Sequence, residues 1–478
     1  MKRILLILLS GLCHFASAQE NLKIDFEKIY TEVFTNSEAY ERLKYSTETL
    51  GHRLTGSENG RKAEEYVHDL LASYGFKVRY QPFSAQGWAR ESLDLRIDGA
   101  PVHAVSLAHS PTAADVEAPL IDVGNGLEED YQRLADQVKG KIALVYLHIL
   151  PNSREGIKNL HRSEKTALAT KYGAKGIVFI NSVKNNVLLT GTASITGKLI
   201  DIPAICIGLE DGLQWKERLK NGAMDAQIQM RNTAAEATAR NIVVTLEGTD
   251  LAKEKIVVGG HLDSWDLATG AIDNGIGSFA VIDMARTFKK LKLKPRRSID
   301  FVLFMGEEQG LLGAKAYVEN AMRAGEIDQI KYMLNFDMVN APKGFATTRE
   351  EMLPVLNAIG ATYMEVDSVF KNENAAGAGL HSDHQPFMLQ GIPTGTGRGG
   401  ALPNNAGLYY HSSNDVFALV DKVGLEQTVR VGAAYLWGLA NAAEIPAKKM
   451  TDIELVKFLE AKGLKEPLVI SGEWRFGR

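Results

Sequence analysis

Short apolar runs alternate with stretches of helical spacing along most of the chain. Three of these runs are rich in β-branched and aromatic residues, and they occupy residues 256–258, 298–305 and 332–336. Runs of this kind, bounded by glycine and acidic residues, predict buried strands. Apolar residues at helical spacing predict helices over residues 57–75, 310–320, 350–360 and 422–445. Strands that alternate with helices predict the α/β class.

The middle of the chain, residues 116–232, has its own series of strands and helices. Strand-like runs lie at residues 142–147, 177–180 and 202–207, with helical spacing at 166–172 and 211–219. We therefore predict a domain inserted into a main domain, which is split into residues 19–115 and 233–447. The polar, alanine-rich residues 232–240 are expected to form the return linker before a strand at 241–246. Residues 448–478 would form a C-terminal tail.

The first residues have the pattern of a signal peptide. Lys2 and Arg3 precede a short apolar run, and residues 16–18 read Ala-Ser-Ala, a small-residue cleavage site. We predict a signal peptide over residues 1–18, export, and a secreted or periplasmic protein with no membrane span after cleavage. A membrane anchor would need about 20 apolar residues, which this run does not supply. A lipoprotein signal at Cys13 is disfavoured because bulky Leu12 precedes it.

Composition and charge narrow the function classes. The chain has 478 residues, of which 45% are hydrophobic and 23% charged, as expected of a globular protein with two domains. Loss of Lys2 and Arg3 moves the formal charge from −4 to −6, and no basic run is present. Nucleic acid is therefore not an expected partner. After cleavage only Cys206 remains, within an apolar run, so it is expected to be a buried thiol rather than a nucleophile.

Imidazole and carboxylate groups follow the three predicted strands of the main domain. His261 and Asp263 follow the first strand, Glu307 and Glu308 follow the second, Asp337 follows the third, and His411 ends a later glycine-rich loop. Ligands of open α/β sheets bind outside the carboxyl ends of the strands. Two imidazoles with several carboxylates suit a pair of divalent metals, and zinc favours such mixed nitrogen and oxygen ligands. A two-metal hydrolase is the resulting prediction.

The order of these residues resembles a known ligand pattern. The residues that carry the resemblance are His261, Asp273, Glu307, Glu308, Asp337 and His411, with the motifs at 50–57 and 260–266. They resemble the M28 family of zinc exopeptidases, and the inserted segment resembles the protease-associated (PA) domain of many members. The resemblance implies a mixed-sheet zinc-exopeptidase (phosphorylase/hydrolase-like) catalytic domain with an inserted PA domain.

The resemblance also assigns two Zn²⁺ ions to these ligands. His261 and Asp337 would bind one zinc ion. Glu308 and His411 would bind the other, and Asp273 would bridge the two.

Two further carboxylates would complete the catalytic group. Glu307 would be the general base, and Asp263 would orient His261. Paired zinc ions lower the pKa of a shared water, and a carboxylate that is not itself a ligand must then carry its proton to the leaving amine.

Three residues farther from the metals are candidates for substrate contact. Tyr410 would donate to the oxyanion, although it could equally be a core tyrosine. Arg398 would bind a substrate carboxylate, unless it is an exposed loop arginine. His384, like His381, would contact substrate or support the site. The expected partner is a peptide or dipeptide substrate, and whether the chain forms a homodimer stays open.

The metal ligands do not distinguish a carboxypeptidase or dipeptidase from a zinc aminopeptidase. A catalytically inactive binding protein on the same fold predicts lost ligands, and all are present here. A glutaminyl cyclase is disfavoured because that enzyme lacks the inserted domain. Neither G-x-S-x-G nor H-E-x-x-H occurs, which argues against serine hydrolysis and single-helix zinc proteases.

Overall fold

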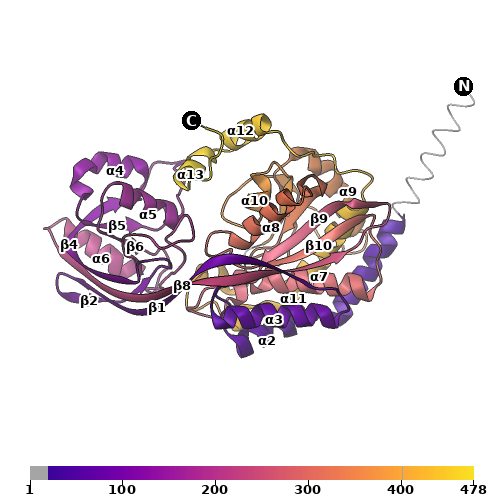
Figure 1. The fold of residues 1–478 in the computed structure, drawn as a ribbon, viewed down its shortest axis with the longest axis horizontal. Helices are drawn as coiled ribbons and strands as arrows, with labels where there is room; N and C mark the ends of the chain where they lie inside the picture. Colours follow the sequence, from indigo (N-terminus) through magenta and orange to yellow (C-terminus); the bar gives the residue numbers. More distant parts are fainter. Residues whose placement is uncertain (1–19, 401, 478) are drawn as a thin grey trace, which may run out of the picture.

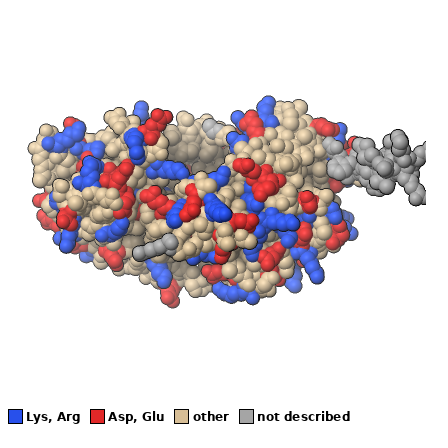
Figure 2. All heavy atoms as spheres, turned by 90° about the horizontal axis from the view of Figure 1, so that it is seen from above, with Lys and Arg blue, Asp and Glu red and all other residues tan. Residues whose placement is uncertain are grey.

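The computed structural model describes residues 20–400 and 402–477 (Figure 1). The predicted signal peptide, residues 1–18, lies outside the described residues. Within the described part of the chain, no helix has the length and apolar character needed to span a membrane. Lysine, arginine, aspartate and glutamate side chains are mixed over the face seen in Figure 2.

Four parallel strands form the centre of the main sheet. In sheet order they are β14 (Thr394–Arg398), β11 (Ile330–Asn335), β9 (Leu251–His261) and β10 (Arg297–Phe304). The sheet is mixed, because β8 (Asp225–Leu246) joins β10 and β12 (Gly344–Thr347) joins β14 in antiparallel pairs, and β13 (Ala375–Ala376) extends the edge. The three predicted strands are β9, β10 and β11, so these predictions are confirmed.

Alternate residues of these strands point to opposite faces of the sheet, and both faces are buried. Ile256 and Val258 pack in one core, against α3 (Glu58–Ser73), α7 (Ile276–Lys290), α9 (Leu353–Met364) and α11 (Lys422–Asn441). Val257 packs in a second core, against α8 (Leu312–Arg323) and α10 (His384–Met388). Residues 20–36 form a helix that, with α2 (Ala39–Tyr45), covers the first face. Helices on both faces explain why the strand runs are continuously apolar.

The first helix of the main domain begins and ends as its sequence predicts. Ser57 is the N-cap of α3, and its Oγ accepts a hydrogen bond from the Gly60 N–H at 3.0 Å. Gly75 follows the helix with φ of +89°, a left-handed conformation that suits glycine. Residues 57–75 thus contain one capped helix.

The second domain is a smaller α/β layer. Strands β4 (Ala113–Gly124), β5 (Ile142–Tyr146), β6 (Gly176–Ile180) and β7 (Ala204–Ile207) are parallel, and β3 (Ala104–Ser106) adds an antiparallel edge. Helices α4 (Glu128–Leu134) and α5 (Arg162–Lys171) pack on one face, and α6 (Leu209–Leu219) packs on the other. Cys206 lies in β7, fully buried, and burial raises its thiol pKa to about 12, so it is no nucleophile.

Two long strands connect the domains, and one of them corrects a prediction. Strand β1 (Arg79–Ile97) pairs with β8 in antiparallel register, with Arg90 opposite Asn232 and Pro82 opposite Arg240. Residues 232–240, predicted to be a linker, are therefore strand. The reason is tertiary, because an alanine-rich stretch carries little strand signal until a partner strand supplies the backbone hydrogen bonds.

Residues before 116 also pack with the second domain. Leu95 and Ile97, near the end of β1, are buried with Ile228 and Met230 of β8 in the core under α6. Strand β2 (Ala100–Val102) pairs with this end of β1, and β3 pairs with β7. The boundary therefore runs across the β1 and β8 strands.

The C-terminal tail lies over both domains (Figure 1). Helices α12 (Asp452–Ala461) and α13 (Lys465–Ile470) bury Leu459 and Leu468 beside Met388 of the main domain. On the other side, the Lys158 ammonium of the second domain donates to the Lys462 carbonyl at 3.3 Å. The tail therefore contacts both halves of the molecule.

The substitution Ile256→Ala tests the core beneath the site. Ile256 is fully buried in β9, so its replacement should lower the free energy of unfolding by about 2–5 kcal/mol, measured by urea denaturation. The matched change Ile453→Ala, at a side chain that is 71% exposed, should shift it by less than about 0.5 kcal/mol. Equal effects from both variants would contradict the assigned core.

Candidate metal centre

His261 is the last residue of β9, where the strand runs beside β11. The Phe336 N–H donates to the Gly259 carbonyl at 2.8 Å. A Cβ on Gly260 would lie only 2.4 Å from the Phe336 carbonyl oxygen. Glycine is therefore needed here, since any side chain would push the strands apart, and this close approach fixes where the His261 imidazole points.

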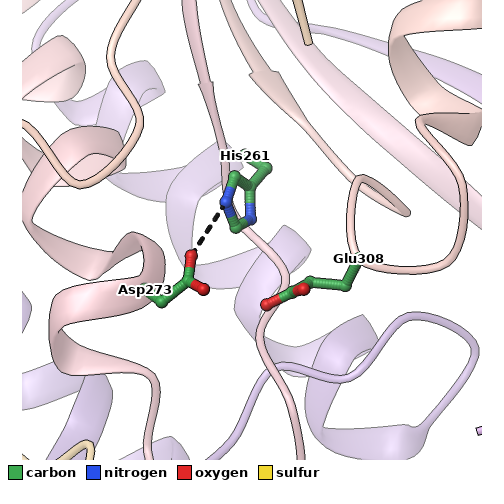
Figure 3. A group of neighbouring side chains, drawn as sticks. All are labelled: His261, Asp273 and Glu308. Carbon is green, nitrogen blue, oxygen red and sulfur yellow. Dashed lines mark ion pairs between the residues drawn. The ribbon is translucent and has the colours of Figure 1, made fainter. Parts of the chain in front are cut away.

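The other candidate ligands come from turns at the same edge of the sheet. Asp273 lies in the turn Ala271–Gly275 before α7, and Glu308 lies in the loop between β10 and α8. Asp337 follows β11, and His411 follows the turn Pro403–Tyr409. Figure 3 shows His261, Asp273 and Glu308 directed toward a common centre, with the first two in an ion pair.

The Asp273 carboxylate faces a histidine on each side. Its Oδ1 lies 3.2 Å from His261 Nε2, and its Oδ2 lies 3.0 Å from His411 Nε2. Asp337 Oδ1 lies 3.4 Å from His261 Nε2, and Glu308 Oε2 lies 2.9 Å from His411 Nε2. The five predicted ligands thus lie as two pairs, His261 with Asp337 and His411 with Glu308, on either side of the Asp273 carboxylate.

The electrostatics of this cluster favour a cation. Burial and the Asp273 charge raise the pKa of Glu308 well above its usual value, and Glu308 Oε1 has no hydrogen-bond partner among the described residues. Burial lowers the pKa of His261, but the charges of Glu307 and Asp337 outweigh it and raise the pKa overall. Because buried charges need partners, this set of acids and imidazoles fits divalent metal ions.

His411 has the opposite shift. Burial and the nearby Arg162 guanidinium lower the pKa of His411 to about 4. The imidazole is therefore neutral near pH 7, which is the form that binds a metal. Its Nδ1 lies 3.3 Å from the Thr190 carbonyl oxygen, an acceptor that would leave Nε2 free as the ligand atom.

Comparison of the sequence with family models relates this chain to known proteins. Residues 241–436 match peptidase family M28, and residues 116–215 match the PA domain. Over residues 241–436 the chain is similar to peptidase family M28. This confirms the family resemblance and the inserted PA domain, and it makes the chain a metallopeptidase, a hydrolase of peptide bonds. The family match and the nitrogen and oxygen donors of the cluster imply zinc.

Curated relatives of this chain include two kinds of exopeptidase. Carboxypeptidase Q of Xenopus laevis is 26% identical over 423 residues, which cover 85% of this chain and 87% of that protein. Probable leucine aminopeptidase 2 of Aspergillus fumigatus is 25% identical over 450 residues, 88% of this chain and 86% of that protein.

Solved structures share the fold. The peptidase M28 precursor from Shewanella amazonensis has a TM-score of 0.76 at 24% identity, covering 91% of this chain and all of that one. An aminopeptidase from Aneurinibacillus sp. strain AM-1 has a TM-score of 0.67 at 24% identity, covering 89% and 98%. These likenesses confirm the predicted mixed-sheet fold.

Asp263 contacts both His261 and the loop that carries Glu307 and Glu308. His261 Nδ1 lies 3.1 Å from the Asp263 carbonyl oxygen and 3.6 Å from its carboxylate, so the carbonyl is the closer partner. The carboxylate accepts the backbone N–H groups of Glu307 at 3.2 Å and Glu308 at 3.3 Å. It also accepts the Thr55 hydroxyl at 3.0 Å. Asp263 therefore fixes the two glutamates as well as the histidine.

Sequence reasoning missed two residues that hold the ligand loops. The Asp415 carboxylate accepts the N–H of Ile272 at 2.7 Å and of Asp273 at 3.0 Å. Arg53 is fully buried, and its guanidinium donates to three carbonyl oxygens at 2.5–2.8 Å, those of Leu262, Thr269 and Gly270. Arg53 lies in the motif at 50–57, which carried the family resemblance but assigned it no role.

A cleft lies beside the candidate metal ligands. The main domain contributes Glu307, Glu308 and Tyr410 to its walls, the second domain contributes Arg162, and the tail contributes Glu473. The Tyr410 ring stacks on His411 with centroids 3.6 Å apart, and burial raises the pKa of its phenol. The phenol is therefore protonated at neutral pH and able to donate.

Two predicted substrate contacts lie outside this cleft. Arg398 is exposed at the end of β14, where its Nη1 donates to the Glu373 carbonyl oxygen at 2.8 Å. His384 is buried in α10, with Nε2 3.2 Å from the Gly379 carbonyl oxygen. Neither lines the cleft. The glycine-rich sequence around these two residues did not predict which way their side chains point. In the structure, contacts with backbone carbonyl groups hold both side chains outside the cleft.

Asp415→Asn tests whether Asp415 holds the bridging ligand. The amide can accept only one of the two backbone N–H groups, so the Asp273 turn loosens, and we expect zinc affinity to fall about 10–100-fold in competition with a chromogenic chelator. Asp69→Asn, at a side chain that is 83% exposed, is the control and should bind zinc like the wild type. Unchanged affinity in Asp415→Asn would show that Asp415 is not needed.

Proposed function

We propose that this chain is an exported exopeptidase that uses two zinc ions to hydrolyse the terminal bond of peptides or dipeptides. The observation that carries the proposal is the Asp273 carboxylate, whose two oxygens face His261 and His411 separately. A carboxylate that contacts two imidazoles in this way suits a bridging ligand between two metal ions.

The five side chains would hold the metals as two half-sites. One is formed by His261 and Asp337, the other by His411 and Glu308, with Asp273 shared. Zinc in such a site acts as a Lewis acid and lowers the pKa of water.

The remaining residues would manage protons and the reacting carbonyl. Glu307 lines the cleft beside the cluster, and burial with the nearby carboxylates raises its pKa well above its usual value. A carboxylate with a raised pKa is suited to accept a proton from water and return it to the leaving amine. The Tyr410 hydroxyl, in the same cleft, would donate to the oxygen of the scissile carbonyl.

Carboxypeptidase or dipeptidase activity is our first choice, and zinc aminopeptidase is the alternative. Relatives of both kinds cover at least 85% of the chain. An inactive binding protein is disfavoured, because the five candidate ligands lie together and Glu307 lines the adjoining cleft with Glu308. Export follows from the signal peptide predicted at residues 1–18, and a peptide rather than nucleic acid remains the proposed partner.

Glu307→Gln and Glu308→Gln form a matched pair that separates chemistry from metal binding. Glu307→Gln should keep the bound zinc but lower kcat by about 10²–10⁴-fold, because the amide cannot accept a proton. Glu308→Gln should lose zinc, because an amide replaces a ligand carboxylate. Zinc would be measured by elemental analysis and kcat on a dipeptide. Full activity in Glu307→Gln would exclude it as the base.

The reaction itself can be tested on the mature protein, residues 19–478. Chelation should abolish hydrolysis of unblocked dipeptides, and activity should return as zinc is added, reaching a plateau at two equivalents. Release of C-terminal residues from N-acylated peptides, without cleavage of aminoacyl-nitroanilides, would support the carboxypeptidase. The reverse pattern would select the aminopeptidase, and no hydrolysis of either class would reject the proposal.

A further inference from the structure

Glu164 is a buried acid of the inserted domain in the wall of the cleft beside the candidate metal ligands. It lies in the first turn of α5, where His161 and Glu164 form a capping box: the His161 N–H donates to Glu164 Oε2 at 2.8 Å. Only 1% of Glu164 is exposed, and it lines the cleft together with Glu307 and Glu308. One oxygen of this carboxylate therefore caps the helix, which leaves the other for a different partner.

The second oxygen, Oε1, has no hydrogen-bond partner among the described residues. The basic group paired with it is His381 Nε2, at 3.5 Å. An imidazole with an ordinary pKa is mostly neutral at pH 7, and burial and the Arg162 charge lower the pKa of His381 further. His381 therefore supplies no positive charge, and a buried carboxylate without a cation is costly.

The other buried glutamates of the described residues each have a partner or a place in the metal cluster. Glu32 pairs with Arg286 at 2.7 Å, and Glu64 pairs with Arg240 at 2.6 Å. The third, Glu308, is a candidate metal ligand. Glu164 differs from all three, because its charge has no cation.

A second acid of the same cleft shows what a satisfied carboxylate looks like here. Glu473 Oε1 lies 2.6 Å from the Lys315 ammonium, and Glu473 Oε2 accepts a hydrogen bond from the Gln385 amide. Glu473 therefore has both a cation and an amide donor from the main domain. The cleft thus contains one neutralised glutamate of the tail and one glutamate of the inserted domain that is not neutralised.

Glu164 lies one side chain away from the metal ligands. Its neighbour His381 is fixed by stacking on the His161 ring, with centroids 4.6 Å apart, and precedes Ser382, whose hydroxyl donates to Asp337 Oδ2 at 2.6 Å. Glu164 and His381 also line a side groove between the inserted domain and the tail. The free oxygen therefore belongs to the part of the cleft where a substrate side chain would lie, beyond the reacting carbonyl.

We propose that Glu164 binds the cationic side chain of a lysine or arginine residue of the substrate, and so makes basic peptides the preferred substrate class. The proposal rests on the proposed function. A bound ammonium or guanidinium would donate a charge-assisted hydrogen bond to Oε1 and supply the missing positive charge. The N-terminal ammonium of a dipeptide is attached to the Cα next to the scissile carbonyl, so its partner must lie beside the metals. The long, flexible stem of a basic side chain can reach farther.

The first test measures binding without turnover. Nα-acetyl-lysinamide and Nα-acetyl-norleucinamide are blocked at both ends, and norleucine replaces the ammonium of lysine by hydrogen. Both would be titrated, with NMR detection, into zinc-loaded wild type and Glu164→Gln. Glutamine can still accept the His161 N–H, so the capping box is kept while the charge is lost. We expect wild type to bind the lysine probe about tenfold more tightly or better, and Glu164→Gln to lose that difference. Equal binding of the two probes by wild type would overturn the proposal.

The second test measures turnover of matched dipeptides. Wild type should favour lysine over norleucine by about tenfold or more in kcat/KM, in alanyl-lysine against alanyl-norleucine or in lysyl-alanine against norleucyl-alanine. The pair that shows the preference identifies the side of the scissile bond. Glu164→Gln should remove it by slowing the lysine peptide selectively, whereas an equal loss on the norleucine peptide would mean a structural role and overturn the proposal. Glu217→Gln, at a side chain of the same domain that is 68% exposed, is the matched control and should behave like wild type.

The lysine preference should also depend on pH. Burial and the charges of Glu473 and Glu466 raise the pKa of Glu164 to about 7, while the Lys165 charge opposes the rise and His161 and His381 lie alongside. A raised pKa means that the carboxylate forms as the pH rises through about 7, and only the carboxylate attracts a cation. The ratio of kcat/KM for the lysine and norleucine peptides should therefore increase from about pH 6 to about pH 8 in wild type and stay constant in Glu164→Gln. A constant ratio in wild type would contradict the proposal.

Two further comparisons separate the possible failures. If Glu164→Gln slowed alanyl-norleucine but not its N-acetyl form, Glu164 would bind the N-terminal ammonium, and the assignment to a side chain would be overturned. Zinc content and circular dichroism must match wild type in each variant. If wild type hydrolyses none of these peptides, the proposed function fails, and the titration of the blocked probes still decides whether Glu164 binds a cationic side chain.

Discussion

The contacts of one carboxylate, Asp273, organise this structure. Its two oxygens face His261 and His411, which lie 150 positions apart in the sequence. A buried strand ends at His261, and the Asp415 carboxylate holds the turn that contains Asp273. His411 lies against the Thr190 segment of the inserted domain. Together these contacts bring the two histidines to the same carboxylate. The main sheet, the helices on both of its faces and the second domain all contribute to that one geometry.

The inserted domain and the C-terminal tail are parts of the cleft and not appendages. Arg162 reaches His411 from one side, and Glu473 of the tail lines the same cleft and pairs with Lys315 of the main domain at 2.6 Å. A cleft closed by three segments admits a chain end more easily than the middle of a polypeptide. This arrangement agrees with an exopeptidase.

The sequence predicted what depends on local pattern. The strands before His261, Glu307 and Asp337 are apolar runs, and polar residues at their ends must meet at one sheet edge. The sequence did not predict features that depend on contacts with distant residues. Residues 232–240 form a strand only because they pair with β1. Asp415 and Arg162 make backbone and interdomain contacts that no sequence motif indicates. The helix predicted at residues 166–172 began four residues later than α5, which begins at Arg162. The prediction therefore did not place Arg162 in a helix.

The most direct test of the central claim is anomalous X-ray scattering at the zinc edge from crystals of the zinc-loaded protein. The account predicts two peaks on either side of the Asp273 carboxylate, one beside His261 and Asp337, the other beside His411 and Glu308. A single peak, or peaks away from Asp273, would contradict it.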